Sequence, residues 1–216
     1  AGQALGIPAT VTMSGASAYN NAYEASSVQA FAAAGDPSLL RVADVDNVKP
    51  EQMQSMEFGY RGKLTRTFTI DAAVYRNDFQ DFINTQVVLS PLYGEVGDGG
   101  LSVLAMANGD FETWSSYTNS PAEISSWGVS VGAQTKIFGN FDLSANYTKS
   151  KLEFEQDLYP DFRTNWNTPE HKIKAQFGNT SLFENFGFNV AWRYWSEYLW
   201  QASFGDGMVP ETHVLD

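Results

Sequence analysis

The chain has 216 residues, a formal net charge of -12 and no cysteine, and this length permits one ordinary domain or two small ones. The absence of cysteine excludes disulfide scaffolds, thiolate metal sites and cysteine nucleophiles. Because nucleic-acid binding depends on clustered Lys and Arg that neutralise phosphates, the acidic balance argues against a nucleic-acid partner.

The N-terminal part of the sequence shows no sustained alternation of apolar and polar residues. Residues 22–34 are rich in alanine and predict a short helix, which Gly35, Asp36 and Pro37 would end. We therefore expect residues 1–54 to form a long loop with a possible short helix.

The first two predicted strands form a hairpin. An alternating run begins at Met56, and a second one begins at Phe68. Directly opposed residues of antiparallel strands lie on the same face of the sheet, so Leu64 is expected opposite Phe68 with a short turn between them. The same register places Arg61 opposite Asp71.

The hairpin pattern recurs twice. In the second pair, Lys136 is expected opposite Asp142, and Asn140 suits the left-handed position that ends the turn between them. The second pair is expected at residues 127–137 and 141–147, and the third pair at residues 173–177 and 186–194. A seventh strand is expected to begin near His213.

The connections between these strands differ in length. They are short within each hairpin and long between hairpins, at residues 89–123, 156–170 and 201–212, and this asymmetry is typical of outer-membrane barrels. No stretch reaches the run of roughly 18 apolar residues that a membrane-spanning helix requires. A soluble β-sandwich also alternates, but its strands are usually shorter than the run at residues 141–155.

We therefore predict an all-β fold, a fragment of a transmembrane antiparallel β-barrel in which residues 1–216 are part of one domain and residues 55–216 hold about six full strands plus the start of a seventh. Strand-end aromatic residues fit an interfacial girdle, or alternatively a cluster beneath a loop. The lipid-facing set should be Phe58, Tyr60, Ile70, Val74, Val129, Val131, Leu143, Phe188, Val190 and Trp192. The lumen-facing set should be Arg61, Asp71, Lys136, Asp142, Asn189 and Arg193, including two ion pairs that could contact a plug.

Five phrases occur in the order found in barrels of TonB-dependent receptors. They are NVKPEQMQSMEFGY at residues 47–60, FTIDAAVYRNDFQDFI at 68–83, NYTKSKLEF at 146–154, NTPEHKIKAQFGN at 167–179, and FGFNVAWRYWSEYLWQASFGDGMVP at 186–210. From about Ala22 to its end the chain resembles this family, and specifically its Bacteroidetes-type subgroup. The resemblance implies a fragment of a larger barrel of about 22 strands.

The resemblance also implies a function, which is energy-coupled import of a nutrient across the bacterial outer membrane. The implied partners are outer-membrane lipid, a plug domain, the remaining barrel strands, a TonB-type energy-coupling protein and, in the subgroup, a surface lipoprotein lid. The sequence contains no recognisable plug domain, TonB box or terminal aromatic strand, so we expect it to be part of a longer protein. The alternative is a passive porin-like or adhesin-like barrel without energy coupling, and a soluble carbohydrate-binding sandwich is a third hypothesis.

No residue is assigned to catalysis, to a cofactor or to a metal, so the chain is not expected to be an enzyme, and its ligand-binding residues are unknown. His171 and His213 lie far apart in the sequence and lack the ligand pattern of a metal site. The loop GEVGDGG at residues 94–100 has too few acids for a calcium loop. The aromatic residues expected in the long connections, either at a ligand-capturing mouth or packing the loops together, are Tyr93, Trp114, Tyr159, Trp166 and Phe204.

Overall fold

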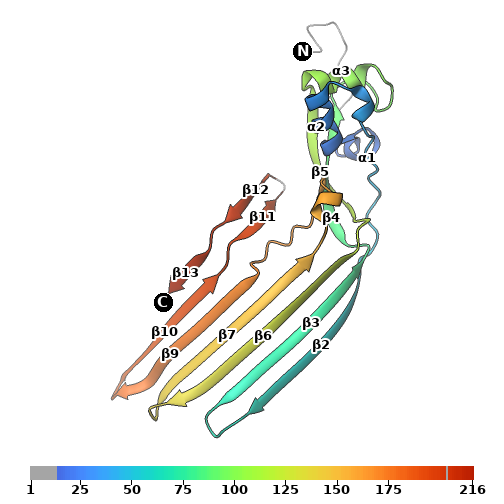
Figure 1. The fold of residues 1–216 in the computed structure, drawn as a ribbon. Helices are drawn as coiled ribbons and strands as arrows, with labels where there is room; N and C mark the ends of the chain where they lie inside the picture. Colours follow the sequence, from blue (N-terminus) through green and yellow to red (C-terminus); the bar gives the residue numbers. More distant parts are fainter. Residues whose placement is uncertain (1–13, 203) are drawn as a thin grey trace. The chain divides into compact units, whose positions relative to one another are not determined.

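The computed structural model describes residues 14–202 and 204–216. The chain divides into two compact units, each assembled from three segments. The first, called the loop unit, contains Ala1–Glu51, Asp81–Ala122 and Glu155–Thr164, and the second, called the sheet unit, contains Gln52–Gln80, Glu123–Phe154 and Asn165–Asp216. Figure 1 shows the elements of both units.

The sheet unit contains an antiparallel sheet of seven strands in the order β13-β10-β9-β7-β6-β3-β2, whose strands run side by side in Figure 1. Each strand pairs with the strand that precedes or follows it in this sheet along the chain, as in a β-barrel wall. The strands are β2 (Gln52–Lys63), β3 (Thr69–Gln80), β6 (Ile124–Ile137), β7 (Phe141–Glu153), β9 (His171–Phe183), β10 (Phe186–Trp195) and β13 (Thr212–Leu215). A separate hairpin consists of β11 (Tyr198–Ala202) and β12 (Gly205–Val209).

The predicted registers are confirmed. Arg61 pairs with Asp71 in the first hairpin, and Lys136 pairs with Asp142 in the second. The seventh strand begins at Thr212, next to the predicted position. The first strand begins at Gln52, slightly earlier than its alternation indicates.

The two predicted sets of residues lie on opposite faces of the sheet. One row contains Tyr60, Ala72, Val131 and Tyr147, while the neighbouring row on the other face contains Arg61 and its partners. On the apolar face Phe58 is 76% exposed and Tyr60 is 57% exposed, so no other part of the described chain covers them. This is the surface expected of a barrel wall against lipid.

The prediction for the turn at Asn140 is wrong. Positive φ angles occur at Phe138 (47°) and Gly139 (86°), and Asn140 is not among the positive-φ residues of the described chain. Because Ile137 pairs with Phe141, the turn has three residues, and its first two rather than its last are left-handed. The chain therefore takes its left-handed step earlier in the turn than the asparagine preference predicts.

The long connections are not simple loops, which corrects the expectation for residues 89–123. This stretch contains the end of β4 (Ile83–Pro91), helix α3 (Leu101–Asn108) and strand β5 (Phe111–Asn119). Similarly, the predicted loop at residues 201–212 holds most of the β11-β12 hairpin. Short turns do join the other ends of the strands, as between Phe183 and Phe186.

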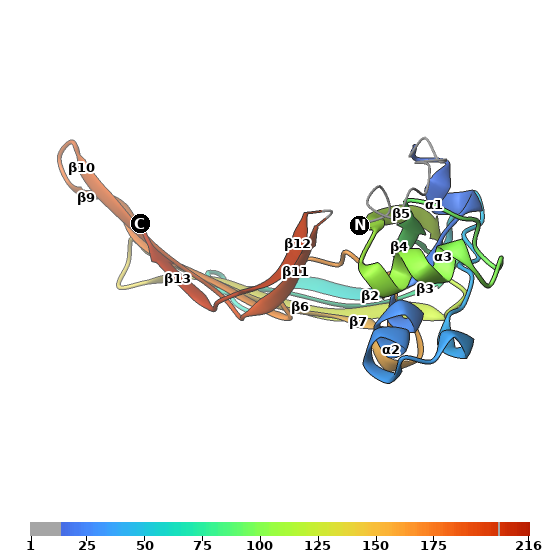
Figure 2. The same ribbon diagram turned by 90° about the horizontal axis from the view of Figure 1, so that it is seen from above.

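The loop unit is built around a sheet in the order β1-β4-β5, with β8 also paired to β4. The two short strands are β1 (Tyr23–Glu24) and β8 (Phe162–Arg163), and the helical elements are α1 (Ser17–Asn20), α2 (Ala25–Ala34), η2 (Pro37–Leu39) and η3 (Gln156–Leu158). Helix α2 is the predicted alanine-rich helix, and Gly35 ends it in the left-handed conformation at φ 70°. Figure 2 shows α2 and α3 beside β4 and β5.

Two apolar clusters form the core of the loop unit. The first contains Tyr23, Val28, Phe31, Leu89 and Met106, and thus joins β1, α2, β4 and α3. The second contains Ala18, Ala22, Val45 and Val88. In the described part of the chain no helix has the length and apolar character needed to cross a membrane.

Candidate ligand-binding cleft

A cleft of about 440 Å³ lies within the loop unit, in the range of about 300–1,000 Å³ that small-ligand sites occupy. Three stretches distant in sequence form it: β1 with the segment that follows η2, strands β4 and β5, and the segment around β8. The lining residues are Glu24, Arg41, Asp44, Asp46, Gln86, Thr118, Asn119, Pro121, Leu158, Tyr159, Pro160, Asp161 and Phe162.

Strands β4 and β5 contribute a polar floor. Gln86 pairs with Ser116 on β5 and with Phe162 on β8, so its side chain is held at the middle of the sheet. It is 4% exposed, and its Oε1 has no hydrogen-bond partner among the described residues. A buried acceptor without a partner is costly unless a ligand or water satisfies it.

Thr118 and Asn119 at the end of β5 fix the chain that borders this floor. Thr118 donates from its hydroxyl to the backbone oxygen of Asp46 at 3.0 Å. The Asn119 amide oxygen accepts from the backbone nitrogen of Lys49 at 2.6 Å, and its nitrogen donates to the backbone oxygen of Lys49 at 3.0 Å. These bonds hold residues 46–49 against the sheet edge.

The segment after η2 contributes charged groups. Arg41 pairs with Glu24 of β1, with 2.5 Å between Nε and Oε2. Beyond it Val45 is buried at 7% exposure, whereas Asp44 and Asp46 on either side of it are exposed. Alternation in this extended segment therefore directs both carboxylates away from the core while the valine anchors the backbone.

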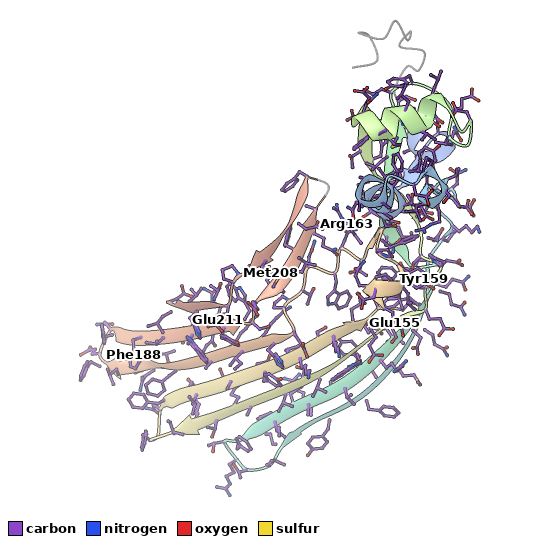
Figure 3. All side chains as sticks on the ribbon, turned by 45° about the horizontal axis from the view of Figure 1, so that its top comes forward. Glu155, Tyr159, Arg163, Phe188, Met208 and Glu211 are labelled. Carbon is purple, nitrogen blue, oxygen red and sulfur yellow. The ribbon has the colours of Figure 1, made fainter. Side chains whose placement is uncertain are left out.

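The third wall comes from the segment around β8, where Figure 3 marks Tyr159 and Arg163. Asp161 is 8% exposed, and its two carboxylate oxygens accept from the backbone nitrogen and the hydroxyl of Ser26 at 2.6 and 2.7 Å. It thus caps the N-terminus of α2, where a negative charge is favoured. Tyr159 and Phe162 pack edge to face with ring centroids 6.2 Å apart.

The electrostatic balance of the cleft is acidic. Its lining holds four carboxylates, from Glu24, Asp44, Asp46 and Asp161, against the single guanidinium of Arg41. The loop unit as a whole contains thirteen Asp and Glu and three Lys and Arg, so it carries -10 of the chain's net charge of -12. The cleft therefore offers mainly hydrogen-bond acceptors in a negative field.

The aromatic residues predicted for the long connections have different environments in the structure. Tyr159 lines the cleft, and Trp114 packs on the second apolar cluster. Tyr93 is buried and donates its hydroxyl to Asp110 at 2.9 Å; burial raises its pKa, and this residue packs the unit internally. In the sheet unit, Trp166 is half-buried and Phe204 is 92% exposed.

The histidines and the glycine-rich loop have local roles. His171 shares a hydrogen bond of 2.8 Å between its Nδ1 and the Tyr147 hydroxyl, and the His213 ring stacks on Trp192 at 5.8 Å. In the loop at residues 94–100, Asp98 accepts a hydrogen bond from the Ser102 hydroxyl at 2.7 Å. Within residues 14–202 and 204–216, no group of three or more His, Cys, Asp and Glu is placed to hold a metal ion.

Sequence reasoning missed most residues of the cleft. Asp44 and Asp46 had a usable signal, because they alternate with the apolar Ala43 and Val45. The position of Asp161 had none, because its partner Ser26 is 135 residues away in the sequence. Gln86 also gave no signal, since a glutamine within a strand is an ordinary surface residue until its burial is known.

Comparisons with known proteins agree with the fold. Residues 7–214 match the family of TonB dependent receptor-like β-barrels. A solved structure, "Copper transporter OprC", is similar at a TM-score of 0.53 and 16% sequence identity, over 79% of this chain and 23% of that one. The chain thus spans about a quarter of the length of that protein. No curated protein matches the chain.

Proposed function

Because the chain belongs to the TonB dependent receptor-like β-barrel family, we propose that it is part of an outer-membrane receptor that imports a nutrient by energy-coupled transport. The seven-stranded sheet is part of the transmembrane wall of the barrel. The family is one of receptors and transporters, not of enzymes. The loop unit is an elaboration of the same barrel domain, because its segments precede β2 or connect neighbouring strands of the sheet.

The observation that carries the proposal is the difference between the two ends of the strands. Tight turns join the two strands of each hairpin, whereas the connections between hairpins, together with the segment before β2, fold into an acidic unit with a cleft. In outer-membrane barrels the end with long connections is extracellular. A folded loop unit with a cleft is therefore suited to capturing a solute outside the cell.

The proposed partners follow from the family. A plug domain and the remaining strands complete the barrel, outer-membrane lipid contacts the apolar face, and a TonB-type protein supplies the energy. We also propose that the chain belongs to the Bacteroidetes-type subgroup, which the phrases at residues 47–60 and 186–210 resemble, and that a surface lipoprotein lid covers the long connections. The alternative is a passive or adhesive barrel without energy coupling.

The decisive experiment replaces residues 81–122 in the full-length receptor by a short Gly-Ser turn. Phe79 of β3 is directly paired with Ile124 of β6, so a short turn can join these strands without changing the register. A matched control exchanges the turn at residues 65–67, at the opposite end of the sheet, for a Gly-containing turn. Assembly is checked by the heat-dependent mobility of the folded barrel on detergent gels, and uptake is measured across candidate nutrients.

We expect the variant without residues 81–122 to assemble but to lose uptake, and the control to retain both. In the unaltered protein, uptake should stop when the inner-membrane energy coupling is removed. Undiminished uptake after the replacement would contradict the capturing role of the loop unit. Uptake that persists without energy coupling would favour the passive alternative.

A further inference from the structure

We propose that the cleft of the loop unit binds an organic cation, a solute with ammonium or guanidinium groups that donate hydrogen bonds. This inference rests on the proposed function and names the class of ligand that the receptor captures. Its basis is a buried acceptor without a partner, in a cleft whose other polar groups are mostly carboxylates.

Gln86 is the first argument. It is one of the residues that line the cleft, it is 4% exposed, and its buried Oε1 has no hydrogen-bond partner in the described part of the chain. An amide oxygen can only accept, so the group that satisfies it must be a donor. Two residues earlier on β4, Asn84 is 1% exposed and leaves both amide atoms without partners among the described residues. Folding thus leaves unsatisfied polar groups along β4, one of them in the wall of the cleft.

The charges give the second argument. Glu24 is already paired with Arg41 and Asp161 with Ser26, which leaves the exposed carboxylates of Asp44 and Asp46 as the groups that can meet a ligand's charge. Among the described residues no group of three or more His, Cys, Asp and Glu is placed to hold a metal ion, whereas an organic cation needs only one carboxylate and a few acceptors. An anion would be repelled by the same field.

The aromatic pair gives the third argument. Tyr159 and Phe162 stand edge to face at one side of the cleft. Cations are attracted to aromatic faces, and alkyl chains that connect cationic groups pack well on rings. The cleft therefore combines acceptors, carboxylates and an aromatic surface, as recognition of an amine- or guanidine-bearing solute requires.

The test uses the full-length receptor in detergent and titration calorimetry with agmatine, a small molecule with one guanidinium and one ammonium group. Maltotriose is the neutral probe and Mg²⁺ is the metal probe. We expect agmatine to bind and the other two probes to bind at least about tenfold more weakly, because charge-assisted hydrogen bonds are the stronger ones. Equal affinity for maltotriose would assign the cleft to neutral solutes and overturn the proposal, as would preference for Mg²⁺.

Three variants locate the binding. The double variant Asp44→Asn/Asp46→Asn should weaken agmatine binding about tenfold or more. The control Glu95→Gln/Glu112→Gln removes the same charge from exposed positions of the loop unit that do not line the cleft, and should change binding less than about threefold. Equal loss in both would show that only the general field attracts agmatine, and the cleft proposal would fail.

Gln86→Leu separates a binding role from a structural one. Because Oε1 has no partner among the described residues, the variant should unfold at the same temperature as the unaltered protein or a higher one, yet bind agmatine more weakly. Unchanged binding would overturn the role of Gln86. If agmatine bound but no energised uptake occurred, the proposed import function would fail and the proposal for the cleft would stand. If another nutrient were taken up with energy coupling but agmatine did not bind, the proposal for the cleft would fail and the import function would stand.

Discussion

The hydroxyl of Tyr75 on β3 lies 2.8 Å from the hydroxyl of Ser150 on β7, although β6 runs between these strands. The residue of β6 between them is Gly128, which pairs with both. A Cβ atom at Gly128 would lie 2.5 Å from the Tyr75 ring and 2.6 Å from the backbone oxygen of Lys149. The glycine is thus required for the ring to cross the strand.

The first prediction is that Gly128→Ala destabilises the barrel wall by about 1–3 kcal/mol, the usual cost of overpacking. The matched control is Gly132→Ala on the same strand and face, where the nearest atom to a new Cβ is the Asn146 side-chain nitrogen at 3.3 Å. Urea unfolding of the full-length protein in detergent measures both. If the two variants were equally stable, Gly128 would not be needed to make room for the Tyr75 ring.

The second prediction concerns the two ion pairs across hairpins. Lys136 and Asp142 are 2.9 Å apart, whereas Arg61 and Asp71 are 3.6 Å apart, and all four side chains are at least 42% exposed. Exposed pairs contribute about 0.2–1 kcal/mol, so double-mutant cycles to Ala should give a coupling in this range that is larger for Lys136 and Asp142. Coupling should fall in high salt. A larger coupling for the longer pair would contradict this reading.

The registers of the sheet could be predicted because two simple constraints act together. Opposed residues must share a face, and one face is apolar, so Leu64 must lie opposite Phe68 rather than one position away. The same reasoning gives the pairing of Lys136 with Asp142. Turn geometry was less predictable, since residues other than the expected Asn140 took the positive φ angles.

The loop unit could not be predicted because its elements depend on contacts between residues that are far apart in the sequence. Strand β4 is buried at nearly every position, so its sequence shows no alternation. Strands β1 and β8 have only two residues each, too few for any period. The cleft depends on contacts such as Ser26 with Asp161, which join distant segments, and only the alanine-rich helix α2 was visible in advance.

The third prediction concerns acid sensitivity of the loop at residues 94–100. Partial burial of Asp98 opposes its ionisation, but hydrogen bonds from Ser102, Gly100 and Glu95 outweigh this and lower its pKa. Because the folded-state pKa lies below the unfolded value of about 3.9, its stabilising contribution is present above about pH 4 and is lost as the pH falls through the folded-state pKa.

Hydrogen exchange in helix α3 measures this effect. In the unaltered protein, protection of the first turn of α3 should be constant from neutral pH to about pH 4 and should fall below that. Asp98→Asn should lower protection at neutral pH and remove the acid-dependent change, while Glu95→Gln should leave the profile as it is. An acid-dependent loss of protection that persists in Asp98→Asn would assign the effect to another group.

The last prediction concerns Asn119, which joins three stretches of the loop unit. Its amide nitrogen donates to the backbone oxygens of Lys49 and Asp81, at 3.0 and 2.5 Å, and its oxygen accepts from the backbone nitrogen of Lys49 at 2.6 Å. Asn119→Asp keeps the shape but replaces the donor by a charged oxygen that faces two carbonyl oxygens. Leaving these acceptors unsatisfied costs about 1–3 kcal/mol, so the border of the cleft should loosen.

Limited proteolysis of the full-length protein with thermolysin, which cleaves before apolar residues, detects this loosening as faster cleavage before the exposed Val48, the neighbour of Lys49, whose backbone Asn119 holds. The control Asn108→Asp changes an amide on α3 that bonds the Tyr93 hydroxyl instead, and it should leave cleavage before Val48 at its original rate. Strand β5 pairs with β4 independently of this side chain, so both variants should assemble normally. If Asn119→Asp were cleaved no faster than the control, the amide would not be what holds this segment to the sheet, and the border of the cleft would depend on Thr118 and the buried Val45 alone.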